Sequence, residues 1–206
     1  MEEIKTVIFS GIVQVLIFSL VPFIWYLVGH RTVKGFLPWL GFKTKRPMPI
    51  KSIAVISLFF MVATFVPYMV MFKNGSINST NLPFVTFKKY GFGFTYVFVL
   101  VFFSVVQTGL SEEIFFRGFL GKRLIGKLGF KIGNALQALI FAAIHLPAVK
   151  GALESMIVLV FTVGIAYVLG YLAEKKCDGS IVYGWIVHAL VNIISGIYVS
   201  MYLFKL

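Results

Sequence analysis

Long apolar runs alternate with short polar stretches along the whole chain. Most of these runs reach the roughly 20 residues that an α-helix needs to cross a bilayer. We therefore expect about six membrane segments, at residues 4–28, 52–72, 94–120, 132–145, 153–173 and 181–204. The fourth is short, and a short apolar helix that ends at a polar residue indicates a helix that stops at a cavity inside the bundle.

The predicted fold is all-α, a polytopic transmembrane helical bundle in which the motif-bearing helices surround a polar cavity within the membrane. Hydrophobic residues make up 59% of the chain and charged residues 13%, against about 45–50% and about 25% in soluble domains. We expect one integral membrane domain over residues 1–206, with a motif core over about residues 94–200. The stretches between segments, 30–51, 73–93, 121–131 and 174–180, are predicted as loops or turns.

The net charge of +12 could indicate a nucleic-acid partner. However, the basic residues fall in short loops between apolar runs, where they act as topology signals and as anchors for anionic lipid headgroups. The loops after the first, third and fifth segments hold about thirteen of the nineteen Lys and Arg residues. The positive-inside rule then places these loops in the cytoplasm and both termini outside. The expected partner is the lipid bilayer and not nucleic acid.

Glu112, Glu113 and Arg117 lie near the end of the third apolar run. A charged side chain at membrane depth costs roughly 2.5–3.5 kcal/mol on insertion scales, so we interpret these residues as functional groups that face a cavity. Glu113 and Arg117 are four residues apart and can pair on one helical face. Glu112 points about 100° away and is left as a carboxylate suited to general-base chemistry. The alternative is an ion pair at the membrane surface beside a solvated Glu112.

Three further polar residues lie in apolar segments: His145, His188 and Asn192. His145 ends the fourth segment and is either a functional group or a core histidine bonded to a backbone carbonyl. His188 and Asn192 are four residues apart on one face, and two hydrogen-bond donors one turn apart could hold a developing oxyanion. A polar clamp between two helices is the alternative for this pair. The single Cys177 excludes an internal disulfide and a cysteine metal cluster.

Taken together, these residues form three motifs that resemble those of the CAAX-protease and bacteriocin-processing family of intramembrane glutamate proteases. They are Glu-Glu-x-x-x-Arg at Glu112, Glu113 and Arg117, then Phe-x-x-x-His at Phe141 and His145, then His-x-x-x-Asn at His188 and Asn192. The resemblance covers about residues 111–195 and implies a membrane-embedded endopeptidase with no covalent intermediate and no cofactor. It implies that Glu112 activates a water with help from His145, and that His188 and Asn192 hold the oxyanion. Glu113, Arg117 and Phe141 would support the site.

The chain is similar to the compact bacterial members of this family, which implies a bacterial plasma membrane. The implied substrate is a membrane-associated peptide or protein, in CAAX-type, peptide-pheromone or bacteriocin-related processing. The short chain argues against prenylated substrates. Because Arg117 and Lys122 lie near the cytoplasmic end, we expect the cavity to open toward the cytoplasm through a basic mouth.

Three other functions stay open at this point. Glu112, His145 and His188 could bind zinc in a metallopeptidase. The chain could be a non-catalytic immunity or interaction protein that binds a bacteriocin or a sensor kinase. It could also be a small transporter with a Glu and His proton relay, although no inverted repeat is visible.

Overall fold

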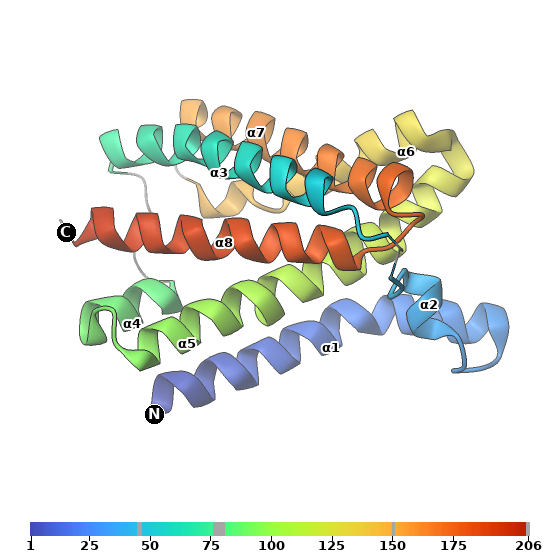
Figure 1. Cartoon of the computed structure of the whole chain (residues 1–206), viewed down its shortest axis with the longest axis horizontal. Coiled ribbons are helices and arrows are strands. Elements are labelled where there is room, and N and C mark those ends of the chain that lie inside the picture. Colours follow the sequence, from blue (N-terminus) through green and yellow to red (C-terminus); the bar gives the residue numbers. More distant parts are fainter. Residues whose placement is uncertain (45–46, 76–80, 150, 205–206) are drawn as a thin grey trace.

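A computed structural model describes residues 1–44, 47–75, 81–149 and 151–204 (Figure 1). All regular structure in these residues is helical. The elements are α1 (Glu2–His30), α2 (Phe36–Leu40), α3 (Ile50–Lys73), α4 (Leu82–Tyr90), α5 (Phe94–Phe102), η1 (Phe103–Leu110), η2 (Glu113–Gly121), α6 (Lys122–Ala143), η3 (Leu146–Ala148), α7 (Ala152–Tyr171), η4 (Leu172–Lys176) and α8 (Val182–Leu203). The all-α membrane bundle expected from the sequence is confirmed.

Five helical runs among the described residues are long and apolar enough to cross a membrane. One of them, from Phe94 to Ala143, has 50 residues, more than twice what a single crossing needs. This run folds back on itself at Gly129, whose φ of 75° and ψ of 165° break the helix. Only glycine adopts such a conformation without strain. The run therefore contains both the third and the fourth predicted segments, and about six segments result.

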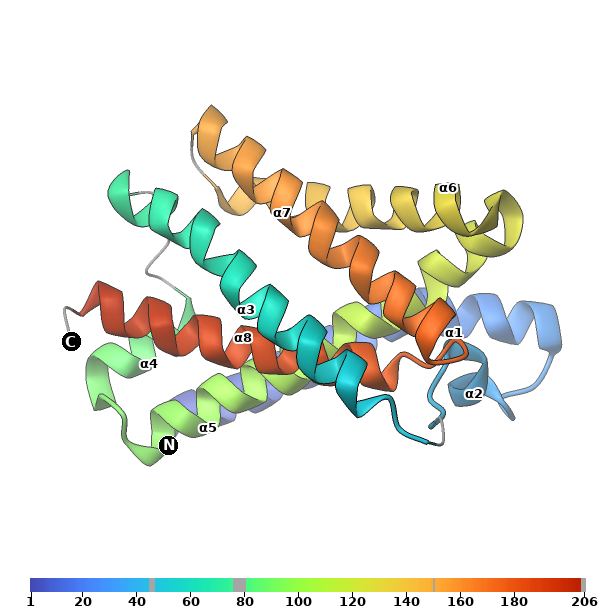
Figure 2. The ribbon, with the colours of Figure 1, turned by 45° about the horizontal axis from the view of Figure 1, so that its top comes forward.

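The bundle has two ends with different elements (Figures 1 and 2). At one end, here called the α2 end, lie α2, the reversal of α6 at Gly129, η4 and the start of α8. Hydrogen bonds hold this end together: the Ile181 amide donates to the Gly41 carbonyl oxygen over 3.0 Å. At the other end, the α4 end, lie α4, the start of α5 and the ends of α3 and α8. There Lys89 of α4 forms an ion pair with Glu3 of α1 at 2.7 Å.

Three stretches predicted as loops contain helix. Residues 30–51 include α2, residues 73–93 include α4, and residues 122–128 form the first turns of α6. The reason is tertiary packing. In α4, Phe87 is 3% exposed and packs on Tyr96 and Leu100 of α5, while Pro83 suits the first turn of a helix. These short elements gain their stability from the bundle, and their own sequence carries little signal for it.

Polar side chains join α1 to the helix that carries the Glu pair. Ser10 donates a hydrogen bond to Gln107 Oε1 over 2.9 Å, and Gln14 donates to Ser111 Oγ over 3.2 Å. Ser111 is fully buried and directly precedes Glu112. Hydrogen bonds between helices hold a bundle together in lipid. These two bonds therefore fix the position and rotation of the helix at Glu112 relative to α1.

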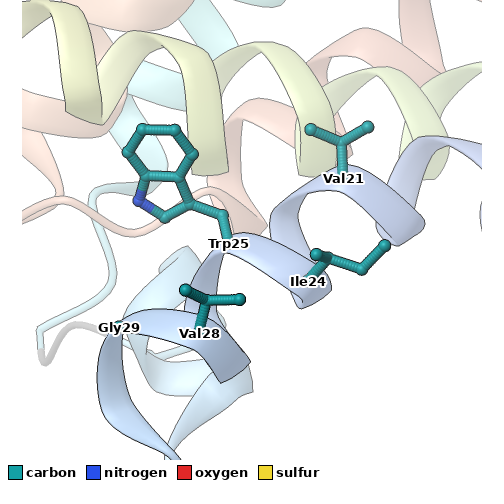
Figure 3. Close-up of a pocket in the computed structure, with 5 residues that line it drawn as sticks. All are labelled: Val21, Ile24, Trp25, Val28 and Gly29. Atoms are coloured by element: carbon teal, nitrogen blue, oxygen red, sulfur yellow. The ribbon is translucent and has the colours of Figure 1, made fainter.

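A hollow of about 500 Å³ lies on the outer surface of α1 at Val21, Ile24, Trp25, Val28 and Gly29 (Figure 3). Its lining residues are apolar, and Trp25 is 59% exposed. None of these side chains carries an acid, a base or a nucleophile. Apolar side chains on the outside of a membrane-spanning helix meet lipid tails, so we do not assign this hollow to the chemistry.

Candidate active site

A polar cavity of about 180 Å³ lies inside the bundle and brings together residues from distant parts of the sequence. Glu112, His145, His188 and Asn192 all line it. They come from the long bent helix, from the turn after α6 and from α8. The three motifs identified in the sequence therefore converge on one cavity. The short fourth segment also ends as predicted, because α6 stops at Ala143 and His145 reaches the cavity.

The helix around Glu112 has an unusual backbone. Two π-helical stretches, η1 and η2, lie on either side of residues 111 and 112. Such wide turns are rare and occur frequently at functional sites. Side chains bond to the carbonyls of η1: the Thr108 hydroxyl donates to Phe103 O over 3.1 Å, and the Trp185 indole donates to Val105 O over 2.7 Å. The second bond also attaches α8 to this helix.

Glu113 and Arg117 form the ion pair that their spacing predicts. Arg117 Nη1 lies 3.1 Å from Glu113 Oε1, and the two side chains are 1% and 0% exposed. The Arg117 guanidinium lies over the Phe141 ring at 4.4 Å, which is a favourable cation–π distance. Phe141 therefore covers one face of the buried cation.

His188 connects this ion pair to Glu112. Its Nδ1 is 3.2 Å from Glu113 Oε1 and its Nε2 is 3.7 Å from Glu112 Oε2. Glu113 thus contacts both the Arg117 guanidinium and the His188 imidazole. The imidazole ring lies between the carboxylates of Glu113 and Glu112. A ring nitrogen that donates to a carboxylate has its orientation fixed by that bond.

α8 approaches Glu113 closely at Gly184. A Cβ atom at this position would lie 3.0 Å from Glu113 Oε2, and Glu113 cannot move aside because Arg117 and His188 hold it. We expect Gly184→Ala to destabilise the protein by about 1–3 kcal/mol through overpacking. Thermal unfolding in detergent checks this. Gly164→Ala is the matched control, since nothing lies within 4 Å of a Cβ there; an equal loss in both variants would contradict the explanation.

Asn192 lies one turn beyond His188 and faces the same cavity, as the spacing predicts. Its Nδ2 donates to the Thr108 hydroxyl over 3.0 Å. Since a side-chain amide has two N–H donors, one of them remains for another acceptor. Thr108 is a site residue that sequence reasoning missed. A signal for it exists: Ser104, Thr108 and Glu112 recur every four residues, and all three line the cavity.

His145 also lines the cavity, from the turn between α6 and η3. Its Nδ1 is 2.7 Å from the Phe141 carbonyl oxygen, so Nδ1 carries a proton and donates it in that bond. In a neutral imidazole the other nitrogen, Nε2, is then an acceptor. The bond to a backbone carbonyl that the alternative interpretation predicts is therefore present, and it leaves Nε2 for the functional role, which stays a prediction.

The expectation of a basic mouth is wrong. Arg117 is 3% exposed, and neither it nor Lys122 lines the cavity. Lys122 instead donates to Glu174 and to the Gly179 carbonyl at the α2 end, over 3.0 and 2.7 Å. The cavity extends from Glu112 in the other direction, to Pro83 and Phe84 of α4 and to Asn81, which directly precedes α4.

The ligand set proposed for zinc can also be compared with the geometry. Among the residues that the structure describes, no three His, Cys, Asp or Glu side chains are grouped as a metal site requires. Glu112 and His188 are neighbours at 3.7 Å, but His145 does not complete a set with them. The arrangement favours separate roles for the two histidines.

Residues 93–194 match the family described as type II CAAX prenyl endopeptidase Rce1-like. The chain belongs to this family. The match contains all seven motif residues and excludes α1 to α4. The Rce1-like assignment places the chain among the intramembrane endopeptidases at the level of the family. With five long apolar helices in the part that the structure describes, it is a multi-pass membrane protein. No curated protein and no solved structure matches the chain.

Proposed function

We propose that this Rce1-like protein is a glutamate-dependent endopeptidase of the bacterial plasma membrane, in which Glu112 activates a water molecule. The observation that carries the proposal is the cavity that gathers Glu112, His145, His188 and Asn192 from three separate parts of the chain. The substrate is a membrane-associated peptide or protein, in CAAX-type, pheromone or bacteriocin-related processing. The distribution of basic residues supports both termini outside.

Two hydrogen-bond donors support the proposed oxyanion site. His188 Nδ1 lies 3.2 Å from Glu113 Oε1, and this contact sets the orientation of the ring. Its Nε2 lies 3.7 Å from Glu112 Oε2, beyond hydrogen-bond distance, on a side chain that lines the cavity. An N–H at Nε2 and the second N–H of Asn192 would be two donors directed into the cavity.

The reaction follows from these positions. A water between Glu112 and His145 gives a proton to the Glu112 carboxylate, and its oxygen attacks the carbonyl carbon of the substrate. The negative charge that develops on the carbonyl oxygen is held by His188 and Asn192. Glu112 then gives the proton to the amide nitrogen, the C–N bond breaks, and the products are a carboxylic acid and an amine. His145 Nε2, an acceptor, orients the water.

The proposal is tested with the purified protein in detergent or lipid and a panel of membrane-tethered peptides, read by mass spectrometry. Cleavage in the presence of hydroxylamine distinguishes direct attack of water from an acyl-enzyme: we expect a free carboxylic acid and no hydroxamate. A hydroxamate would overturn the mechanism. Activity that is lost with a chelator and restored by zinc would favour the metallopeptidase, and an absence of cleavage across the panel would favour the immunity or interaction protein.

Asn192→Ala is expected to reduce kcat by about 10²–10³-fold, because one oxyanion donor is lost. The value of KM should change much less, since the donor acts on charge that develops in the transition state. The measurement is the rate of peptide cleavage under saturating substrate. Thr108→Val serves as a comparison: it removes the acceptor that holds Asn192 at 3.0 Å but keeps the amide. If Asn192→Ala left kcat unchanged, Asn192 would be a clamp between helices.

A further inference from the structure

The two ends of the bundle carry different charge. Counting only described residues, the α2 end has ten basic and two acidic side chains, whereas the α4 end has four basic and three acidic ones. The basic residues of the α2 end are Arg31, Lys34, Lys43, Lys51, Lys122, Arg123, Lys127, Lys131, Lys175 and Lys176. By the positive-inside rule the α2 end is cytoplasmic and the α4 end is not.

The catalytic cavity extends toward the α4 end. On the helix of Glu112 the lining residues precede the carboxylate, at Thr108, Ser104 and Leu100, and this helix begins at the α4 end. On α8 they follow His188, at Asn192 and Ser195, and α8 finishes at the same end. Pro83 and Phe84 of α4 supply further lining, as does the exposed Asn81 just before α4.

Toward the α2 end the site is closed. The Glu113–Arg117 pair and Phe116 are almost fully buried on that side. A space beyond Arg117, beside Gln137, has a volume of only about 10 Å³, which is enough for about one water molecule. A substrate peptide cannot pass through this region without opening the buried ion pair.

A second cleft joins the cavity from the side. It has a volume of about 360 Å³ and lies mainly between α3 and α7. Four residues line both spaces: Tyr68, Asn81, Phe84 and His145. Most of its other side chains are apolar, among them Met71, Phe161 and Ile165. Its shape and chemistry fit an apolar peptide segment that reaches His145 from the membrane.

We propose that the substrate enters from the α4 end, so that the enzyme cuts exported or membrane-anchored peptides from the non-cytoplasmic side. This rests on the proposed function for the cutting itself. The apolar segment of the peptide would occupy the cleft between α3 and α7, and its scissile bond would reach Glu112 past Asn81. A protein whose cleavage site is confined to the cytoplasm would not reach the carboxylate by this route.

Cysteine labelling in intact cells tests the route without any need for a substrate. The native Cys177 is fully buried, so the wild type gives the background. Asn81→Cys tests the entrance. Thr108→Cys tests the cavity wall, because Thr108 lines the cavity and is only half-buried. Lys127→Cys tests the α2 end. Val101→Cys is the matched control for Thr108, because Val101 lies on the same helical run and is 40% exposed on its surface outside the cavity.

A charged, membrane-impermeant thiol reagent added outside should label Asn81→Cys and Thr108→Cys. It should label Lys127→Cys only after the membrane is opened. Val101→Cys should react at least about tenfold more slowly than Thr108→Cys, because a thiol in lipid does not form the reactive thiolate. Labelling of Asn81→Cys or Thr108→Cys only from the cytoplasmic side, or no labelling of Thr108→Cys from either side, would overturn the route. A route confirmed in a protein that cuts no peptide would instead refute the proposed hydrolysis.

Discussion

Glu112→Gln should reduce peptide cleavage by about 10²–10⁴-fold, the usual contribution of a general base. The amide of Gln has nearly the shape of the carboxylate but cannot take a proton from water. Glu112 is 9% exposed at the cavity and pairs with no guanidinium within the described part of the chain, so its replacement leaves no buried arginine there unpaired. The measurement is the cleavage rate by mass spectrometry, for variant and wild type in the same lipid.

Two controls distinguish a loss of chemistry from a loss of folding or a general effect of removing a carboxylate. The unfolding temperature of Glu112→Gln should stay within a few degrees of the wild type, which shows that the lost activity is chemical. Glu174→Gln, at the α2 end beside Lys122, changes a carboxylate outside the cavity and should retain the wild-type rate. Cleavage that persisted in Glu112→Gln would exclude this residue as the base and direct attention to His145.

Arg117→Met is expected to cost about 3–5 kcal/mol of stability, because it leaves the buried Glu113 carboxylate without its cation. The guanidinium is 1% exposed and 3.1 Å from Glu113 Oε1, so water cannot replace it. Methionine retains a flexible apolar chain of comparable length against Phe141. Denaturant unfolding in detergent, followed by helical circular dichroism, gives the difference in free energy.

The double variant Glu113→Gln with Arg117→Met distinguishes the loss of stability caused by an unpaired charge from the loss caused by changed packing. When both partners of a buried pair are neutral, most of the lost stability should return. Activity should remain low, since His188 Nδ1 then lacks the carboxylate that orients its ring at 3.2 Å. If the losses of the two single variants simply added in the double variant, the pair would not be coupled and the account of the site would fail.

The sequence predicted the local geometry well where a helical period relates two residues. Glu113 and Arg117 pair as expected, and His188 and Asn192 share one face. The period of a helix is fixed by its backbone and needs no knowledge of neighbouring elements. The last predicted segment, 181–204, agrees with α8 to within one residue at each end, because an apolar run of that length is typical of a membrane-spanning helix.

What the sequence could not predict depends on partners distant in the chain. The hydrogen bond from Asn192 to Thr108 joins residues 84 positions apart. The direction of the cavity depends on which helices surround it, and the presence of Arg117 and Lys122 near the motif wrongly indicated a basic mouth. α4 has only nine residues, too few to show a reliable period, and its position on α5 and α8 becomes evident only in the assembled bundle.

The location of Glu113 and Arg117 on one helix has a consequence for biosynthesis. A lone charge costs roughly 2.5–3.5 kcal/mol when a helix centre leaves the translocon for lipid, but this helix brings its own counter-ion at 3.1 Å. It can enter the bilayer before α8 has been made. His188 arrives only with α8, 75 positions after Glu113 in the chain, so the proposed catalytic set is incomplete until α8 has been made. A nascent copy therefore cannot cleave other chains, or itself, before α8 is inserted.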